Sequence, residues 1–383
     1  MREYPKEFIE KVISWRHYLH TIPETAFEEK ETSAFVAEKL KSFGIETATG
    51  IGGTGVVGTL KAGDSDRVIG LRADMDALNI PDKGCHDHVS THPGKIHGCG
   101  HDGHTITLLA AAEVLSQKRD FNGTVRFIFQ PAEEPGRGAP AMIADGLFEK
   151  YPVDEIYGMH NMPSIPAGHF HTRVGGFMAS EDNFTIKITG RGGHASSPHL
   201  VIDPLAPACE IYLALQTIVS RNASPVRPVV VSCTEWETDG AHNAIPTHVT
   251  IKGDTRSTTP GDSALIENRM REICGHICEM NGASCEFTYT HEFFPLVNDE
   301  ECVKKAVRAA SDELGADSVD SNAEPWMGSE DFAAFLKKVP GCFFVIGTGK
   351  GYTPLHNACF DYNDEIISTG IRVWDALVHE CLK

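Results

Sequence analysis

Five short segments of the sequence carry side chains that commonly bind metal ions. In chain order they contain Asp74 and Asp76, Cys99 and His101, Glu133 and Glu134, His160, and His356. Each segment follows, or lies downstream of, a strand predicted from the pattern of apolar residues. Ligands gather at the carboxyl ends of the strands in open α/β sheets, so we predict that these segments converge on one site. No segment is specific alone, but the joint pattern favours a metal centre.

This mixture of side chains suits a pair of divalent cations. Imidazole and thiolate bind zinc and related borderline ions, and carboxylate also accepts manganese. A bridging anionic ligand lets two cations lie about 3.5–4 Å apart, where they polarise a carbonyl group and acidify a shared water molecule. One carboxylate must then stay uncoordinated to accept the water proton. The adjacent Glu133 and Glu134, between Pro131 and Pro135, could supply one ligand and one base.

An alternation of short strands and helices predicts the domain that positions these segments. The predicted strands are 68–73, 124–129, 155–159 and 342–346, and the predicted helices include 31–43, 105–115 with Asp102 as its N-cap, 140–148 and 364–382. Such alternation is typical of an α/β domain with a mostly parallel sheet flanked by helices. We expect this catalytic domain to occupy residues 1–180 and 295–383.

The middle of the sequence has a different order of elements. Strands predicted at 184–189, 229–236, 248–254 and 285–291 combine with helices predicted at 204–219 and 262–280. The resulting order, β-α-β-β-α-β, is that of a ferredoxin-like α+β layer. We therefore predict that residues 181–294 form a domain inserted into the α/β domain.

The motifs resemble those of the metallo-aminoacylase and carboxypeptidase family. The first four are Arg-Ala-Asp-Met-Asp-Ala-Leu, His-Gly-Cys-Gly-His-Asp-Gly-His, Gln-Pro-Ala-Glu-Glu and Gly-Met-His-Asn. Later segments follow in the family's order, namely Gly-Arg-Gly-Gly-His-Ala, Asn-Ala-Ile-Pro, Asp-Thr-Arg-Ser, Ser-Glu-Asp-Phe and Pro-Leu-His-Asn. The narrower likeness is to the branch that contains hippurate hydrolase and the indole-acetyl-amino-acid hydrolases. It implies metal-dependent hydrolysis of N-acyl amino acids, with hippurate, which yields benzoate and glycine, as the first substrate candidate.

The resemblance also assigns roles to residues of the α/β domain. The positions that match metal ligands are Cys99, His101, Glu134, His160 and His356, with Cys99 as the bridge. Glu133 matches the general base, and Asp76 matches a carboxylate that orients a ligand. Relatives outside the branch begin their metal set with His-x-Asp, whereas this chain reads Ala-Asp-Met-Asp at that place. The Cys-Gly-His loop must therefore supply the missing ligand.

Three residues of the inserted domain match positions that reach the active site in this family. By the resemblance, His194 would stabilise the oxyanion, and Asn243 with Arg256 would hold the α-carboxylate of the substrate. The inserted domain would act as a lid and a dimerisation domain of a homodimer or higher homo-oligomer, in which His194 and Asn243 arrive from the partner subunit. The resemblance implies two divalent ions per subunit, zinc or manganese, with cobalt and nickel as further candidates.

Composition restricts the partners and the compartment. The chain has 34 basic and 53 acidic residues and a net charge of −19. Such a charge repels phosphate backbones and anionic lipid, so we expect neither nucleic acid nor a membrane as partner. No apolar run reaches the roughly 20 residues that cross a bilayer, and the N-terminus lacks the apolar core of a signal peptide. The eleven cysteines include no Cys-x-x-Cys pair, so we expect reduced thiols and a cytoplasmic location.

Two further segments have alternative interpretations. Gly50–Gly55 matches G-x-G-x-x-G by count, but a strand is predicted at 56–60 where a dinucleotide site needs a helix, so we predict a turn. Residues 82–92 contain Cys85, His86, His88 and His92, and we interpret them as a flexible, solvated loop, with metal binding as the alternative.

Three other functions remain open. They are hydrolysis of other N-acyl or N-acetyl amino acids or of dipeptides, non-catalytic binding of acylated amino acids, and a nicotinamide-dependent reaction at the glycine run.

Overall fold

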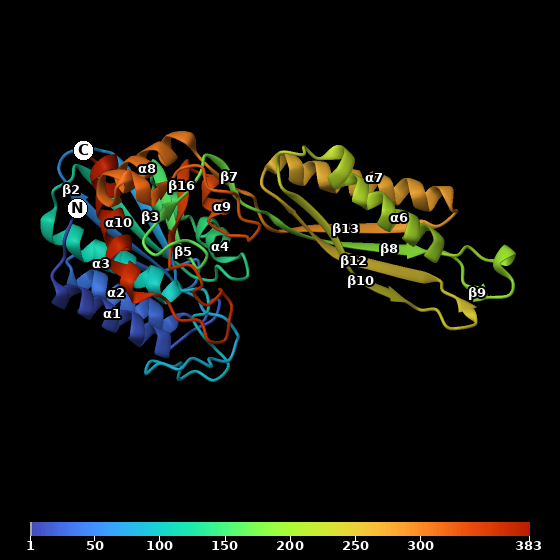
Figure 1. Cartoon of the computed structure of the whole chain (residues 1–383), viewed down its shortest axis with the longest axis horizontal. Coiled ribbons are helices and arrows are strands. Elements are labelled where there is room, and N and C mark those ends of the chain that lie inside the picture. Colours follow the sequence, from blue (N-terminus) through green and yellow to red (C-terminus); the bar gives the residue numbers. More distant parts are fainter. Residues whose placement is uncertain (1) are drawn as a thin grey trace. The chain divides into compact units, whose positions relative to one another are not determined.

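The computed structural model describes residues 2–383 and divides into two compact units (Figure 1). The first unit runs up to Gly175 and continues with Asn298–Glu324 and Glu330–Lys383. The second unit contains Gly176–Val297 and Pro325–Ser329. The longer segment of the second unit, Gly176–Val297, begins and ends within a few residues of the predicted insertion 181–294. The segment Pro325–Ser329 also belongs to this unit, which the sequence did not predict.

An eight-stranded sheet forms the centre of the first unit, in the order β1-β2-β4-β3-β5-β16-β6-β15. Four strands in the middle are parallel, β4 (Gly123–Gln130), β3 (Val68–Asp74), β5 (Glu155–Met162) and β16 (Gly341–Gly347). Antiparallel pairing adds β2 (Gly55–Ala62) with β1 (Glu46–Ile51) at one edge, and β6 (Phe170–His171) at the other, where β15 (Val319–Asp320) pairs parallel with it. The predicted α/β class with a mostly parallel central sheet is confirmed.

Helices cover both faces of this sheet because successive strand residues point to opposite sides. The larger core joins the strands to α1 (Lys6–Thr21), α2 (Lys30–Ser42), α3 (His101–Lys118), α8 (Glu300–Leu314) and α10 (Ile367–Cys381). Within it, Phe344 of β16 lies 5.2 Å from the Trp374 ring of α10. The neighbouring Phe343 instead lies 5.3 Å from Phe332, which precedes α9 (Ala333–Leu336) on the opposite face.

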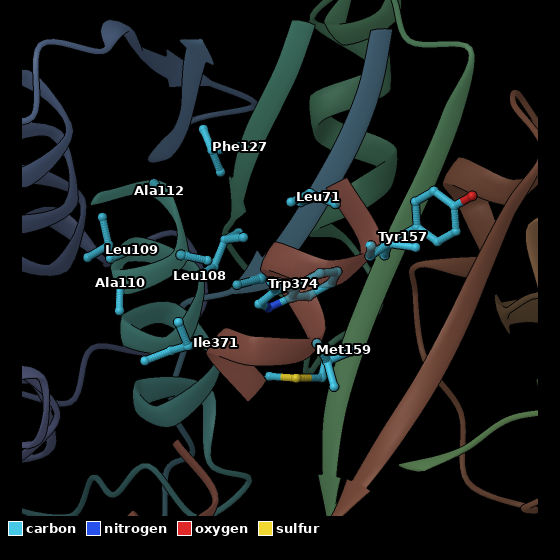
Figure 2. Packing of buried hydrophobic residues seen from close by; sticks show 14 of the residues in the cluster. Leu71, Leu108, Leu109, Ala110, Ala112, Phe127, Tyr157, Met159, Ile371 and Trp374 are labelled. Atoms are coloured by element: carbon cyan, nitrogen blue, oxygen red, sulfur yellow. The ribbon is translucent and has the colours of Figure 1, made fainter. Parts of the chain in front are cut away.

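Helix α3 is buried on all sides, since every residue from His101 to Leu115 is buried. Figure 2 shows Leu108 of this helix pointing toward Trp374 of α10, while Leu109 points to the other side of the helix; both belong to the same buried core as Leu71 and Phe127. A helix enclosed in this way has little freedom to shift. It therefore holds the residues at its N-terminus in fixed positions.

Three details of the predicted elements are wrong. Strand β5 extends to Met162, so His160 lies inside the strand, paired with Val345 of β16, and not after it. Helix α3 begins at His101 with Gly100 at its N-cap position, so Asp102 lies in the first turn and is not the cap. The helix predicted at 140–148 is two short helices, α4 (Gly138–Ala144) and α5 (Leu147–Lys150), because Gly146 between them has a φ of +83°.

The glycine run forms a tight hairpin turn between β1 and β2, as predicted. Gly52 and Gly53 have positive φ values of 65° and 107°, and β2 follows as a strand. A dinucleotide site needs a helix at this place. The structure therefore removes the support for nicotinamide binding at this run.

The second unit has the order predicted for its strands and helices. They are β8 (Glu181–Thr189), α6 (Leu205–Thr217), β10 (Val229–Thr238), β12 (His248–Ser257), α7 (Pro260–Met280) and β13 (Ser284–Phe293). The strands pair antiparallel in the order β10-β12-β8-β13, and a core containing Ile186, Ile211 and Met270 joins the sheet to both helices. The short strands are β7 (Gly175–Met178), β9 (Gly193–His194), β11 (Ala244–Ile245) and β14 (Leu296–Asn298). The role of this unit as a lid stays a prediction.

No helix in the part of the chain that the structure describes is both long and apolar enough to cross a membrane.

The last turn of α10 contains a histidine whose charge stabilises the fold. His379 Nδ1 lies 3.1 Å from Asp375 Oδ1, and its Nε2 lies 2.9 Å from Asp120 Oδ1. The hydrogen bond with Asp375 raises the pKa of His379 to about 9. The pKa of an unfolded histidine is about 6.5, so this contribution is fully present below about pH 6.5 and disappears as the pH rises through about 9.

We therefore expect His379→Asn to lower the free energy of unfolding by about 1–3 kcal/mol at pH 6 and by much less at pH 9.5. Urea denaturation followed by circular dichroism at the two pH values measures this difference. An equal loss at both pH values would show that the charge of His379 contributes nothing.

Candidate metal centre

Side chains that can bind metal ions, one or more from each predicted segment, lie at the carboxyl ends of the parallel strands. Cys99 and His101 lie at the start of α3, Glu134 in the turn after β4, His160 near the end of β5, and His356 in the loop after β16. Their ligand atoms form overlapping sets in which all atoms lie within 4.8 Å of one another. These sets are Cys99, His101 and His160, then Cys99, Glu134 and His356, and then His101, Glu133 and Glu134.

The contacts within these sets fit a pair of cations. Cys99 Sγ lies 3.3 Å from His160 Nε2, and Glu134 Oε2 lies 3.4 Å from His356 Nε2. Among the described residues, the buried His101 Nε2 and Glu134 Oε1 have no hydrogen-bond partner. Buried polar atoms without partners are costly, and a cation bound between them would satisfy both. Cys99, His101 and Glu134 each belong to two of these sets, and the role of Cys99 as the bridge stays a prediction.

Burial opposes the charged forms of several side chains in this cluster. Burial raises the pKa of the Cys99 thiol and of the Glu133 carboxyl well above their usual values, and it raises the pKa of Glu134 to about 7. Burial also lowers the pKa of His160 well below its usual value. Metal ligation requires thiolate, carboxylate and neutral imidazole. A pair of divalent charges would therefore stabilise the deprotonated thiol and carboxyl groups that burial alone opposes.

Asp76 orients two members of the cluster. Its carbonyl oxygen accepts a hydrogen bond from His101 Nδ1 at 2.9 Å, and its Oδ1 lies 3.2 Å from the same nitrogen. Its Oδ2 accepts from the backbone N–H of Glu134 at 3.0 Å. With Nδ1 protonated, Nε2 of His101 is the nitrogen with a free electron pair, and it faces the cluster. This geometry agrees with the orienting role predicted for Asp76.

Comparison with known proteins agrees with the resemblance seen in the motifs. Residues 70–380 match the family described as Peptidase family M20/M25/M40. The chain belongs to this family. It is 39% identical over 368 residues to hippurate hydrolase of Campylobacter jejuni, covering 96% of each chain. It is 36% identical over 374 residues to N-acetylcysteine deacetylase of Bacillus subtilis, covering 97% of each.

A solved structure has the same fold over the whole length. It is that of the YXEP protein of Bacillus subtilis, described as a dinuclear metal binding peptidase from the M20 family. The two chains are 32% identical with a TM-score of 0.86, and the match covers 99% of each. The family recognised from the motifs is therefore confirmed.

A buried arginine in this M20 chain connects the strand ends to the segment before α9. Arg72 Nη1 donates to Asp74 Oδ2 at 2.7 Å, and Arg72 Nη2 donates to Glu330 Oε1 at 2.8 Å. Asp74 in turn accepts from His104 Nδ1 at 2.6 Å. The motifs containing Arg72 and Glu330 were visible in the sequence, but no local pattern indicated that the two residues pair.

Glu29 is a further positioning residue that sequence reasoning missed. Its Oε1 accepts from the backbone N–H groups of Ala132 at 2.9 Å and Phe27 at 3.0 Å, and its Oε2 accepts from Thr54 Oγ1 at 2.5 Å. Burial raises the pKa of Glu29 to about 7. Ala132 has a φ of +51°, a strained conformation that this contact holds directly before Glu133. No signal in the sequence separates Glu29 from an ordinary surface glutamate.

The three site residues predicted in the second unit have partners within that unit. His194 pairs with Ala244 in the short β9–β11 ladder, and the carbonyl of Asn243 accepts from Ala195 N–H at 3.0 Å. Both His194 and Asn243 are exposed. Arg256 contacts Asp254 and Glu181 at 3.0 Å each and donates to Ser329 Oγ at 2.8 Å. Their participation in substrate binding stays a prediction.

The glycine between Cys99 and His101 has no room for a side chain. Gly100 has a φ of +90°, and a Cβ atom there would lie 2.4 Å from Asn161 Oδ1. Gly94, in the same connecting segment, has a φ of +80° but nothing within 4 Å of its Cβ position. The two glycines thus share the backbone conformation and differ in the space around them.

We expect Gly100→Ala to lower the free energy of unfolding by at least about 2 kcal/mol and to reduce the amount of bound metal, because the start of α3 must move. Gly94→Ala serves as the matched control and should cost only about 1 kcal/mol of backbone strain with the metal content unchanged. Urea denaturation and elemental analysis of the purified variants measure both effects. Equal results for the two variants would show that the Cys-Gly-His loop tolerates a shift.

Proposed function

We propose that this chain hydrolyses the amide bond of N-acyl amino acids with two bound divalent cations, and that hippurate is the first substrate to test. The observation that carries this proposal is Glu133, a buried carboxyl beside the ligand-type Glu134 in the turn after β4. The similarity to hippurate hydrolase and N-acetylcysteine deacetylase supports the class of amide and the choice of hippurate.

Five residues would hold the cations, namely Cys99, His101, Glu134, His160 and His356, with Cys99 as the bridge. When bound, two divalent cations would polarise the substrate carbonyl and lower the pKa of a shared water molecule. Zinc and manganese are the first candidates, since the set combines imidazole, thiolate and carboxylate. Cobalt and nickel are further candidates for the same reason.

Glu133 is the general base in this proposal. Its Oε2 lies 4.0 Å from His101 Nε2, so the carboxylate faces the cluster without needing to join it as a ligand. Its Oε1 accepts from the backbone N–H of Asp331 at 3.4 Å, a long hydrogen bond that limits its orientation. It accepts the proton of the attacking water and then donates that proton to the nitrogen of the leaving amino acid. A binder without catalysis would not need such a carboxylate.

His194, Asn243 and Arg256 complete the proposed site. We assign stabilisation of the oxyanion to His194, and binding of the substrate α-carboxylate to Asn243 and Arg256. An arginine can hold a carboxylate through two parallel hydrogen bonds, which supports the role of Arg256. Because Arg256 now pairs with Glu181 and Asp254, the substrate carboxylate would have to replace at least one of these partners.

The second unit supports the proposed homodimer. Strand β10 is an edge strand of its sheet, and exposed edge strands are common places for pairing with a second chain. Apolar side chains of α6 and β10 lie exposed beside one another, with Tyr212 41%, Leu213 67% and Trp236 42% exposed. A second copy of this chain would cover this surface. The cytoplasmic location and the absence of nucleic-acid partners remain predictions from composition.

We expect Glu133→Gln to keep both bound cations and to lose at least about 100-fold in kcat, because the proton acceptor is removed while the ligands stay. Glu134→Gln should lose bound metal together with activity. Release of glycine from hippurate and elemental analysis measure the two effects. Wild-type turnover in Glu133→Gln would show that the base is assigned wrongly.

A substrate panel and metal removal test the function itself. Hippurate, N-acetyl amino acids and dipeptides are assayed for released amine before and after dialysis against EDTA, and again after zinc or manganese is restored. We expect the protein to cleave one of these classes of compound, to lose this activity when the metal is removed, and to regain it when the metal is restored. Full activity in a verified metal-free sample, or no cleavage of any of these compounds, would contradict the proposal.

We expect Leu213→Glu to convert a dimer into a monomer, because a buried charge would face the apolar surface of the partner. The matched control is Val226→Glu, since Val226 is 86% exposed in the same unit and outside this surface. Sedimentation velocity of the two variants separates the species. If His194 acts in the neighbouring site, the monomeric variant should also be inactive, and a monomeric wild-type protein would refute the proposed dimer.

A further inference from the structure

A second cluster of metal-type side chains lies in the first unit, outside the candidate metal centre. The ligand atoms of His20, His86 and Asp361 all lie within 4.8 Å of one another. His20 belongs to α1, His86 to the segment between β3 and α3, and Asp361 to the segment that precedes α10. None of these residues is a ligand in the proposed catalytic site, so this cluster requires its own explanation.

The imidazole of His20 has the orientation of a metal ligand. Its side chain is fully buried, and its Nδ1 contacts Asp102 Oδ2 at 2.8 Å. The carboxylate accepts the proton of Nδ1, so Nε2 carries the free electron pair. Nε2 is buried and has no hydrogen-bond partner among the described residues, since Asp82 Oδ2, at 3.7 Å, is too distant. A histidine held by a carboxylate in this way is the usual arrangement behind a metal ion.

His86 contributes a second imidazole without partners. Both of its ring nitrogens are buried and make no hydrogen bond within the described part of the chain. Its ring stacks on that of His88 at 4.0 Å and meets the edge of the His20 ring at 5.2 Å. His20 and His86 together present three buried ring nitrogens without partners, which is costly unless an ion or a water molecule lies between the rings.

The neighbouring charges favour a cation. Asp82 and Asp102 lie 3.7 and 2.8 Å from the two ring nitrogens of His20, and Asp361 is the third carboxylate of the cluster. Arg16 lies 2.6 Å from both Asp361 and Asp364 and 3.5 Å from Asp102. His88 Nε2 lies 3.0 Å from Arg16 Nη2 and 3.0 Å from Asp361 Oδ1, so this nitrogen has partners. His88 is therefore engaged, whereas His20 and His86 are available as ligands.

Residues 82–92 form a loop in which every residue is exposed or partly exposed, as the sequence predicted, and hydrogen bonds order part of it. Asp82 accepts backbone hydrogen bonds from Gly84 and Ser90, both at 2.8 Å, and so folds the segment. Cys85 is exposed, and His92 Nδ1 donates to the carbonyl of Pro23 at 2.9 Å; neither residue belongs to the group formed by His20, His86 and Asp361. His86 combines two ring nitrogens without hydrogen-bond partners with a ring 5.2 Å from that of His20.

We propose that His20, His86 and Asp361 bind one divalent cation of the borderline class, such as Zn²⁺, separate from the catalytic pair. Two imidazoles, one carboxylate and one water molecule would give such an ion four ligands in tetrahedral coordination. The ion would connect the segment between β3 and α3 to α1 and to the segment before α10. Since the first of these segments leads directly to Cys99, the ion would stiffen the approach to the catalytic cluster. The proposal does not depend on which amide the protein cleaves.

Metal stoichiometry tests this proposal directly. Metal-free protein is dialysed to equilibrium against Zn²⁺, and the bound zinc per chain is measured for the wild type, His86→Ala and His92→Ala. We expect His92→Ala, the matched control from the same segment, to bind as much zinc as the wild type. His86→Ala should bind one ion fewer.

A second background separates this site from the catalytic pair. In the double variant His101→Ala with Glu134→Ala, one zinc ion should remain, and adding His86→Ala or Asp361→Asn should remove it. Urea denaturation of the metal-free forms checks that each variant folds as its parent does. Equal zinc content in His86→Ala and His92→Ala, or no zinc left in the double variant, would overturn the proposal.

Discussion

The buried guanidinium of Arg72 is the interaction on which the catalytic edge of the sheet depends. It is fully buried and pairs with Asp74, Glu330 and Asp331. Breaking such a buried pair costs roughly 3–5 kcal/mol, so these segments can pack only when all partners are in place. Through Asp74 the network reaches His104, and through the backbone N–H of Asp331 it reaches Glu133. One charge thus determines where a strand end, a helix start and the proposed base lie.

The carboxylates of this network explain why the candidate metal centre needs positive charge. Burial raises the pKa of Glu133 well above its usual value, and Glu330, Glu134 and Asp331 raise it further. Arg72 offsets part of this negative charge but lies behind the strand ends, paired with carboxylates of its own. Bound cations would complete the compensation and keep Glu133 ionised, which a general base must be.

The first turn of α3 serves two clusters at once. His101 faces the candidate metal centre, while the next residue, Asp102, accepts from His20 in the second cluster. Successive residues of an α-helix point about 100° apart, so neighbours in sequence can face different sites. Because α3 is enclosed by the sheet and by α1, α2 and α10, a shift at one cluster would be transmitted to the other. The proposed zinc ion at His20 would therefore also stabilise the position of His101.

The sequence by itself determined the types and the order of the side chains proposed for the catalytic site. The apolar patterns predicted strands that precede Asp74, Glu133 and His356 along the chain, and the rule for open α/β sheets predicted that these residues lie at one edge. The β-α-β-β-α-β order of the second unit was likewise visible, because alternation and helical spacing are local properties of the chain. The motifs around Cys99 and His160 were specific enough to indicate the family.

Only the tertiary structure decided which distant groups pair. Asp102 was predicted to cap a helix, yet its side chain contacts His20 of α1. Glu29 accepts a hydrogen bond from Ala132, which lies 103 residues later in the chain, and no periodic pattern in the sequence predicts such a contact. His86 lies in a partly exposed loop, as predicted, yet the fold buries its two ring nitrogens beside His20. The physical reason is the same in each case. The partner that a buried polar side chain contacts depends on the charges and hydrogen-bonding groups around it. Those groups come from distant parts of the chain, and local sequence patterns do not show them.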